Sequence, residues 1–195
     1  MRRWHSASGL FPLGAYLLFH AWEHWPVRRG RDALFARLSH TESAPLELVF
    51  VLLPLLLHAA LGLYLARRGG DARPAYVSPP FRRLQLFTGV VAALFIGVHL
   101  VSAWLPRLLE PSPLGASYGA LRDQVASVPG LVGYVIGLAA VCTHFGQGLG
   151  AALIRLGGER VAQRSARVLG VVLGLLLWLA FVSELATYAT GARLL

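Results

Sequence analysis

One stretch of the chain limits the fold more than any other. Residues 46–66 read LELVFVLLPLLLHAALGLYLA, with one acid, Glu47, near the start and one histidine, His58, inside. At about 1.5 Å per residue, a helix of this length crosses a hydrocarbon core of about 30 Å. Lipid offers an imidazole no hydrogen-bond partner, so a histidine buried there needs something to bind. Each of three further apolar stretches also contains a histidine, and these are His20, His99 and His144.

The composition indicates a helical membrane protein that crosses the bilayer several times. Of its 195 residues, 56% are hydrophobic and 14% are charged, with a mean hydropathy of +0.59. Soluble domains seldom contain apolar runs of eighteen residues. The first run carries polar side chains before any small-residue cleavage pattern, so we interpret it as a mature helix and not as a signal peptide. Cys142 is the single cysteine, which excludes an internal disulfide, a cysteine-ligated iron–sulfur cluster and a CxxCH haem attachment.

Apolar runs separated by Pro, Gly and clustered charges predict an all-α, polytopic fold with one transmembrane domain, residues 1–195. We expect five spans, at about 9–25, 46–66, 84–105, 130–154 and 165–190. The intervening segments are expected to be connections. The longest of them contains residues 118–128, which we expect to form a short helix at the membrane interface.

Every basic side chain is an arginine, and the net charge is +9. The arginines lie in connections and at helix ends, which points to topology and lipid headgroups and argues against nucleic-acid binding. Eleven lie on the side of the N-terminus and seven on the opposite side. Because positive charge favours the cytoplasm, we expect a multi-pass protein of the bacterial inner (cytoplasmic) membrane with its N-terminus in the cytoplasm.

The four histidines fall at two depths. Counted to the nearest flanking cytoplasmic arginine, His20 and His99 are 17 and 16 residues away, and His58 and His144 are 9 and 11 residues away. These counts correspond to about 25, 24, 14 and 16 Å along a helix. Two histidines at equal depth on different helices can supply both axial ligands of a b-type haem. The sequence therefore predicts a four-helix bundle holding two stacked b haems, with iron ligated by His20 and His99 in the outer layer and by His58 and His144 in the inner layer.

Other readings of these residues stay open. An intramembrane histidine also serves as a hydrogen-bonded structural residue or in a proton relay. His24 is an alternative to His20 as a ligand, or a residue at the interface or near a quinone, whereas His5 and His40 lie outside the spans. Small residues share one stripe with His144, either to admit a flat macrocycle or to allow close helix packing; they are Gly133, Gly137, Ala140, Gly148 and Ala151.

In their order and spacing, four segments resemble the di-haem cytochrome b anchor of succinate dehydrogenase and fumarate reductase, in its single-chain, five-helix form. They are RRWHSASGLFPLGAYLLFH, LELVFVLLPLLLHAALGLYLA, LQLFTGVVAALFIGVHL and GYVIGLAAVCTHFGQGLG. The resemblance implies the same histidine pairing. It also implies a quinone-reactive subunit of a succinate:quinone oxidoreductase, with a flavoprotein and an iron–sulfur subunit on the cytoplasmic face. Electrons would pass through two b haems between the iron–sulfur subunit and a membrane quinone, menaquinone in most of this family.

A quinone reaction moves protons, so an acid is expected near the outer haem. Glu47 and Glu23 are the candidates, and each reads equally well as an interfacial cap or an arginine partner. Arg83, Arg164 and Arg167 are candidates for haem propionate contacts, although topology alone explains them. Glu184 is a further buried acid, for protons or for a hydrogen bond between helices.

One position departs from the family pattern. Some fumarate reductases carry a glutamate two residues before the fourth ligand, on a transmembrane proton route, and here that position is Cys142. That route is therefore not expected in this chain.

Two other functions remain as alternatives. One is a haem b subunit of another quinone-linked dehydrogenase, such as a hydrogenase or a formate dehydrogenase. The other is a haem-free membrane transporter or anchor whose histidines relay protons. A reduced-minus-oxidised spectrum separates the last from the redox readings.

Overall fold

The fold is all helical in the part of the chain that the structure, a computed structural model, describes: residues 2–41, 47–68, 79–105, 113–157 and 163–190. The chain starts with helical segments that follow one another directly, namely α1 (Arg2–Ser8), η1 (Gly9–Leu13), α2 (Gly14–His24) and η2 (Trp25–Arg29). η1 is a π-helical turn that contains Pro12. A proline has no N–H for the usual helical bond, so a wider turn accommodates it without ending the helix. Gly30, at a φ of 114°, then reverses the chain.

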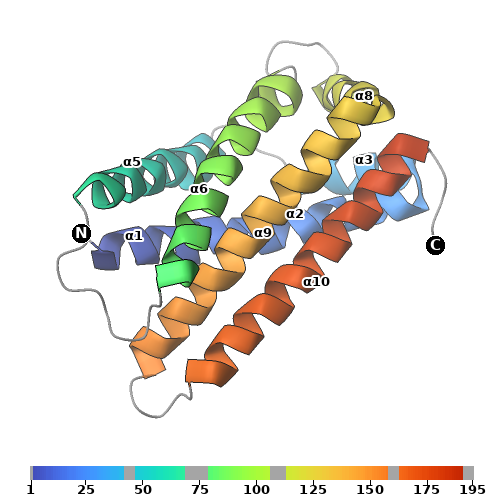
Figure 1. The fold of residues 1–195 in the computed structure, drawn as a ribbon. Helices are drawn as coiled ribbons and strands as arrows, with labels where there is room; N and C mark the ends of the chain where they lie inside the picture. Colours follow the sequence, from blue (N-terminus) through green and yellow to red (C-terminus); the bar gives the residue numbers. More distant parts are fainter. Residues whose placement is uncertain (1, 42–46, 69–78, 106–112, 158–162, 191–195) are drawn as a thin grey trace.

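The remaining helices follow in order. α3 (Arg31–Thr41) precedes η3 (Leu48–Leu52) and α5 (Leu53–Arg67); α6 (Pro79–His99) continues into η4 (Leu100–Trp104); α8 (Pro113–Ala126), α9 (Val128–Gly157) and α10 (Gln163–Thr190) complete the chain. In Figure 1, α6, α9 and α10 lie side by side, α1 and α2 cross them at an angle, and α5 lies next to α1. α9 separates α6 from α10.

Four of the expected spans are supported by length and composition. Within the described residues, the helices that qualify are Val49–Arg67, Pro80–Trp104, Val128–Arg155 and Gln163–Thr190. The first expected span, 9–25, lies inside the helical stretch 2–29, and its crossing of the membrane stays a prediction. The expected helix at 118–128 is present as α8 and begins earlier, at Pro113.

The expected connection 26–45 contains helical structure, namely most of η2 and all of α3. Leu34 and Leu38 lie four residues apart, on one face of α3, and their side chains are 1% and 5% exposed. They join a core cluster where η2, α3, α8, α9 and α10 meet. The charged residues of RDALFARLSHT obscured this short apolar stripe in the sequence.

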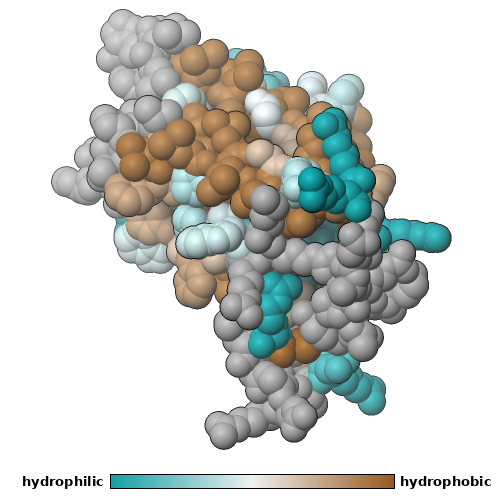
Figure 2. Space-filling view, turned by 90° about the vertical axis from the view of Figure 1, so that its left-hand side faces the viewer, coloured by the Kyte–Doolittle hydropathy of each residue, from teal (hydrophilic) through white to brown (hydrophobic). Residues whose placement is uncertain are grey.

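The outer surface of the spans is apolar. Phe87 and Leu94 on α6, for example, are 66% and 68% exposed. Figure 2 shows hydrophobic residues covering much of the face that is not grey, with a few hydrophilic side chains near its margins. Such a surface is unfavourable in water and suits a hydrocarbon environment.

Candidate functional site

Two pairs of histidine rings meet inside the helical assembly, each pair from two different helices. The ring centroids of His20, on α2, and His99, at the end of α6, are 6.3 Å apart. Those of His58, on α5, and His144, on α9, are 6.1 Å apart. The structure thus brings together the same partners that the depth argument paired. Their role as iron ligands stays a prediction.

The spacing within each pair suits one metal atom bound between two imidazoles. Two metal–nitrogen bonds of about 2 Å, plus about 1 Å from each nitrogen to its ring centre, separate the centroids by about 6 Å. Among the described residues, no group of three or more His, Cys, Asp or Glu side chains could hold a metal ion. A haem, which brings four ring nitrogens of its own, would need only two further ligands from the protein, and each histidine pair could supply them.

Hydrogen bonds at Nδ1 fix the tautomer of two of these rings. His144 Nδ1 lies 3.1 Å from the backbone oxygen of Gln85, and His58 Nδ1 lies 3.0 Å from that of His5. A carbonyl oxygen can only accept, so each Nδ1 carries the hydrogen and each Nε2 keeps its lone pair. Histidines that bind a metal through one ring nitrogen commonly donate the N–H of the other nitrogen to such an oxygen.

The third ring with a hydrogen bond at Nδ1 is His99, whose partner is the hydroxyl oxygen of Tyr134 at 3.2 Å. That hydroxyl donates to the side-chain oxygen of Gln124, on α8, at 2.9 Å. His99 and Tyr134 also pack against Phe95, with centroids 6.0 and 5.2 Å from its ring. At His58, His99 and His144 the hydrogen bonds at Nδ1 therefore leave Nε2 able to bind a haem iron, and haem binding itself stays a prediction.

His5 lies in the site although the sequence placed it outside the spans. Its ring stacks on that of His58, with centroids 4.0 Å apart, and its Nδ1 lies 3.1 Å from the backbone oxygen of His58. Ser8 Oγ approaches His58 Nδ1 at 3.3 Å. The sequence signal that could have found His5 is the helix itself, because α1 and η1 extend the first apolar helix back to Arg2.

His24 also lies close to the outer pair. The ring centroid of His24 lies 4.3 Å from that of His20. The Nδ1 atom of His24 lies 3.1 Å from the hydroxyl oxygen of Tyr188, and Tyr188 is 3% exposed. His24 is thus held by a partner on α10. Tyr188 was not singled out in the sequence.

Of the two purposes that the sequence left open for the small residues, the structure bears on close helix packing, and room for a macrocycle stays a prediction. A Cβ built on Gly133 would meet nothing within 4 Å, and one on Gly148 would meet only the amide nitrogen of Gln85, at 3.9 Å. A Cβ on Gly137 would strike the ring of Phe95. Close helix packing uses another stripe of α9, in which a Cβ on Gly146 would strike the backbone oxygen of Gly170 on α10.

The three acidic residues considered for proton transfer have different surroundings. The indole nitrogen of Trp104 donates to Glu47 Oε2 at 2.8 Å, and Glu23 is 5% exposed. Glu184 pairs with Arg28 at 3.3 Å, and both side chains are 5% exposed. Of the two roles left open for Glu184, the structure shows the contact between helices.

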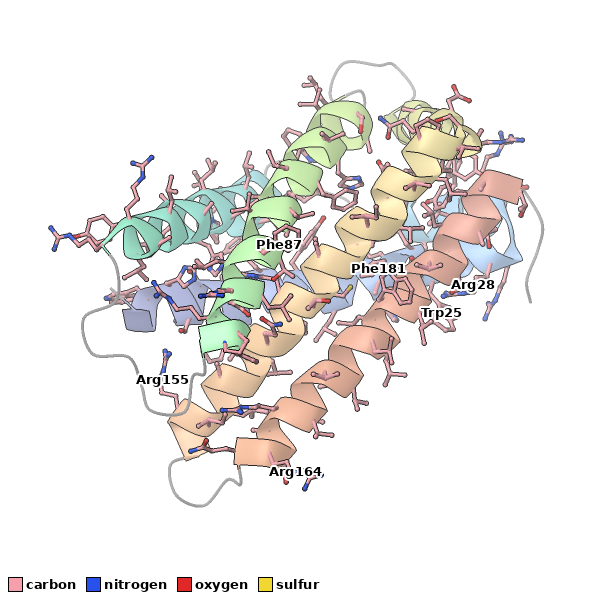
Figure 3. The ribbon with its side chains drawn as sticks, viewed as in Figure 1. Trp25, Arg28, Phe87, Arg155, Arg164 and Phe181 are labelled. Atoms are coloured by element: carbon pink, nitrogen blue, oxygen red, sulfur yellow. The ribbon has the colours of Figure 1, made fainter. Side chains whose placement is uncertain are left out.

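Arg28 is therefore more than a charge that sets topology. It also donates to the backbone oxygen of Ala180, at 2.8 Å, and to the hydroxyl of Ser183. Its guanidinium lies 3.6 Å from the ring centroid of Trp25. Figure 3 shows Trp25 and Arg28 beside α10, far from Arg155 and Arg164 at the other end of the molecule.

The three arginines considered for propionates differ in exposure. Arg83 and Arg164 are exposed, while Arg167 is half-buried and lies over the ring of Phe81 at 5.8 Å. A further arginine, Arg155, donates to Ser6 Oγ at 2.7 Å and so ties α9 to α1. Propionate contacts by these side chains stay a prediction.

Comparison with known proteins supports the resemblance seen in the sequence. The chain is 27% identical over 174 residues to the succinate dehydrogenase cytochrome b558 subunit of Bacillus subtilis (strain 168), a similarity that covers 86% of this chain and 84% of that protein. No family model matches the chain, and no solved structure matches it. The chain is thus similar to the cytochrome b558 subunit of a succinate dehydrogenase.

Proposed function

We propose that this relative of succinate dehydrogenase cytochrome b subunits is itself the membrane anchor of such a complex. In this role it passes electrons between an iron–sulfur subunit and a membrane quinone through two b haems. The observation that carries the proposal is the pairing of four intramembrane histidines into two couples with centroids 6.3 and 6.1 Å apart.

Within this function the chain orients and tunes its cofactors. Haem bound between two imidazoles supplies one-electron transfer at a potential set by its ligands and surroundings. The carbonyls of His5 and Gln85 hold His58 and His144 in the metal-binding tautomer, which raises the basicity of each ligand. The apolar helices exclude water and keep the dielectric constant around the site low.

The outer end of the molecule suits the quinone reaction, which exchanges protons as well as electrons. Glu47 lies beside Trp104, Glu23 is buried one turn after His20, and His24 contacts Tyr188. These groups can hold or move a proton at the carboxylate oxygens and the imidazole nitrogens. We assign the menaquinone site to this end, with Glu47 and Glu23 as its proton-handling candidates.

The opposite end suits the two soluble subunits. α9 ends and α10 begins there, with Arg155, Arg164 and Arg167 near the ends of these helices. By the distribution of arginines this side is cytoplasmic. A flavoprotein and an iron–sulfur subunit bound there would deliver electrons to the inner histidine pair, that of His58 and His144.

The experiment is purification of the complex through a tag on this chain. The proposal expects a flavoprotein and an iron–sulfur protein in the eluate, succinate-dependent reduction of a menaquinone analogue, and a b-type α band in the reduced-minus-oxidised spectrum. A preparation without a b-type band would refute it and favour the haem-free transporter or anchor. A b-type band together with hydrogenase or formate dehydrogenase activity, and none with succinate, would favour the other redox subunit.

A further inference from the structure

We infer that Tyr134 and Gln124 are positioning residues for the outer histidine pair: together they hold His99 in the tautomer that leaves Nε2 free for iron. The inference rests on the proposed function and adds to it a device that links the outer haem to α8. Neither residue was singled out by the sequence.

The directions of two hydrogen bonds at Tyr134 determine which nitrogen of His99 carries the hydrogen. A tyrosine hydroxyl has one hydrogen, and at Tyr134 it is donated to Gln124 Oε1, 2.9 Å away. The phenolic oxygen can therefore only accept from His99 Nδ1, at 3.2 Å. Nδ1 must then carry the hydrogen, and Nε2 keeps its lone pair.

The inner histidine pair has different hydrogen-bond partners. Nδ1 of His58 and Nδ1 of His144 lie against backbone oxygens, which never donate. A hydroxyl can donate or accept. At His99 the tautomer therefore depends on the side chains around that hydroxyl: the Gln124 amide takes up its hydrogen, and Ser102, which also bonds with Tyr134, gives its own hydrogen to the backbone oxygen of Val98.

The surroundings hold this relay in place. Tyr134 is 6% exposed, and Phe95 packs edge to face against its ring. The backbone oxygen of Gln124 accepts from Ser127 Oγ at 2.8 Å, at the turn between α8 and α9. The position of α8 thus fixes Gln124, Gln124 fixes the hydroxyl of Tyr134, and this hydroxyl fixes His99.

The relay predicts the sign of a change in potential. A hydrogen bond from Nδ1–H makes an axial imidazole more basic and favours the oxidised iron. Tyr134→Phe removes the acceptor, so we expect the midpoint potential of the outer haem to become more positive while that of the inner haem is unchanged. Gln124→Leu removes the acceptor that holds the hydroxyl hydrogen away from His99, so the phenolic oxygen becomes a weaker acceptor for Nδ1–H, and the potential of the same haem should shift in the same direction.

The test is a redox titration of the purified complex, monitored by the two haem spectra. Gln124→Glu is the matched control, because a carboxylate still accepts from Tyr134 and cannot donate when ionised; the outer potential should then stay at or below that of the unchanged protein. Selective loss of the outer haem in Tyr134→Phe also supports the inference. If Tyr134→Phe loses both haems, the potential of the outer haem in Gln124→Leu decides whether the inference holds.

Unchanged potentials in both Tyr134→Phe and Gln124→Leu would overturn the inference, as would equal shifts of both haems. The proposed function would survive either result. It fails instead if the unchanged protein contains no b haem.

Discussion

Arg28 and Glu184 form an ion pair in a setting where neither charge has much contact with solvent. Each side chain is 5% exposed, and the charged atoms are 3.3 Å apart. Arg28 also donates to Ala180 and Ser183 on α10. Breaking such a pair leaves an uncompensated buried charge, whereas replacing both members with apolar groups often costs little.

This contrast gives a prediction at the residue scale. Arg28→Ala should lower the free energy of unfolding by about 3–5 kcal/mol, and adding Glu184→Leu should restore most of it. Equilibrium unfolding in detergent micelles measures both. The control is Arg31→Ala, which removes an exposed pair with Asp32 and should change stability by less than about 0.5 kcal/mol. Additive losses in the double variant would contradict the prediction.

At the residue scale, the sequence was sufficient to predict which histidines lie at the same depth in the membrane. His20, His58, His99 and His144 stand alone in apolar runs, so their pairing could be worked out by counting residues. The partners of these histidines could not be predicted in this way. His5, Tyr134 and Gln124 reach them through tertiary contacts, and such contacts leave no periodic signal.

At the scale of the helices, α9 and α10 approach each other most closely through glycines. A Cβ on Gly146 would strike the backbone oxygen of Gly170, and a Cβ on Gly170 would strike that of Gly146. A Cβ on Gly174 would lie 2.7 Å from the backbone oxygen of Cys142. Small residues allow such approach between helices in lipid, where van der Waals packing drives association. The small-residue stripe that the sequence pointed out on α9 is a different one, which contains His144 and was left open between room for a macrocycle and helix packing.

Gly146→Ala should therefore destabilise the protein by about 1–3 kcal/mol, since the new methyl group meets backbone that cannot move aside. Thermal unfolding of the detergent-solubilised protein measures this. The matched variant is Gly119→Ala on α8, where a Cβ would meet nothing within 4 Å; it should be neutral or gain up to about 1 kcal/mol from helix propensity. Equal effects of the two substitutions would rule out close packing at Gly146.

Helix existence was easier to predict than helix extent. Four long apolar runs correspond to described helices that can cross a membrane. α3 was missed because its apolar stripe is short and lies among arginines. The start of the first helix was missed because RRWHSAS is rich in polar residues. In the structure this segment forms α1, which packs against α5.

At the scale of the whole molecule, the distribution of arginines predicts the orientation in the membrane. Figure 3 shows Arg155 and Arg164 at one end of the molecule and Arg28 toward the other. Arg28 is buried in an ion pair, so part of the positive charge counted on the outer side is neutralised there. The orientation with the N-terminus in the cytoplasm stays a prediction, which rests on the count of arginines on the two sides.

Single-cysteine labelling tests this orientation. Cys142 is 1% exposed and should stay silent toward a membrane-impermeant maleimide. Asp123→Cys on α8 and Ser165→Cys on α10 each place a thiol at an exposed position. On intact cells we expect the reagent to label Asp123→Cys and to leave Ser165→Cys unlabelled until the membrane is broken. The reverse pattern would place the N-terminus outside.

The central claim is that four histidines bind two haems as the pairs His20–His99 and His58–His144. Low-temperature reduced-minus-oxidised spectra of single alanine variants test it directly. The account predicts that His20→Ala and His99→Ala lose one spectral component and that His58→Ala and His144→Ala lose the other. His5→Ala and His24→Ala, the controls, should keep both. Loss of one shared component in His58→Ala and His99→Ala would contradict the pairing.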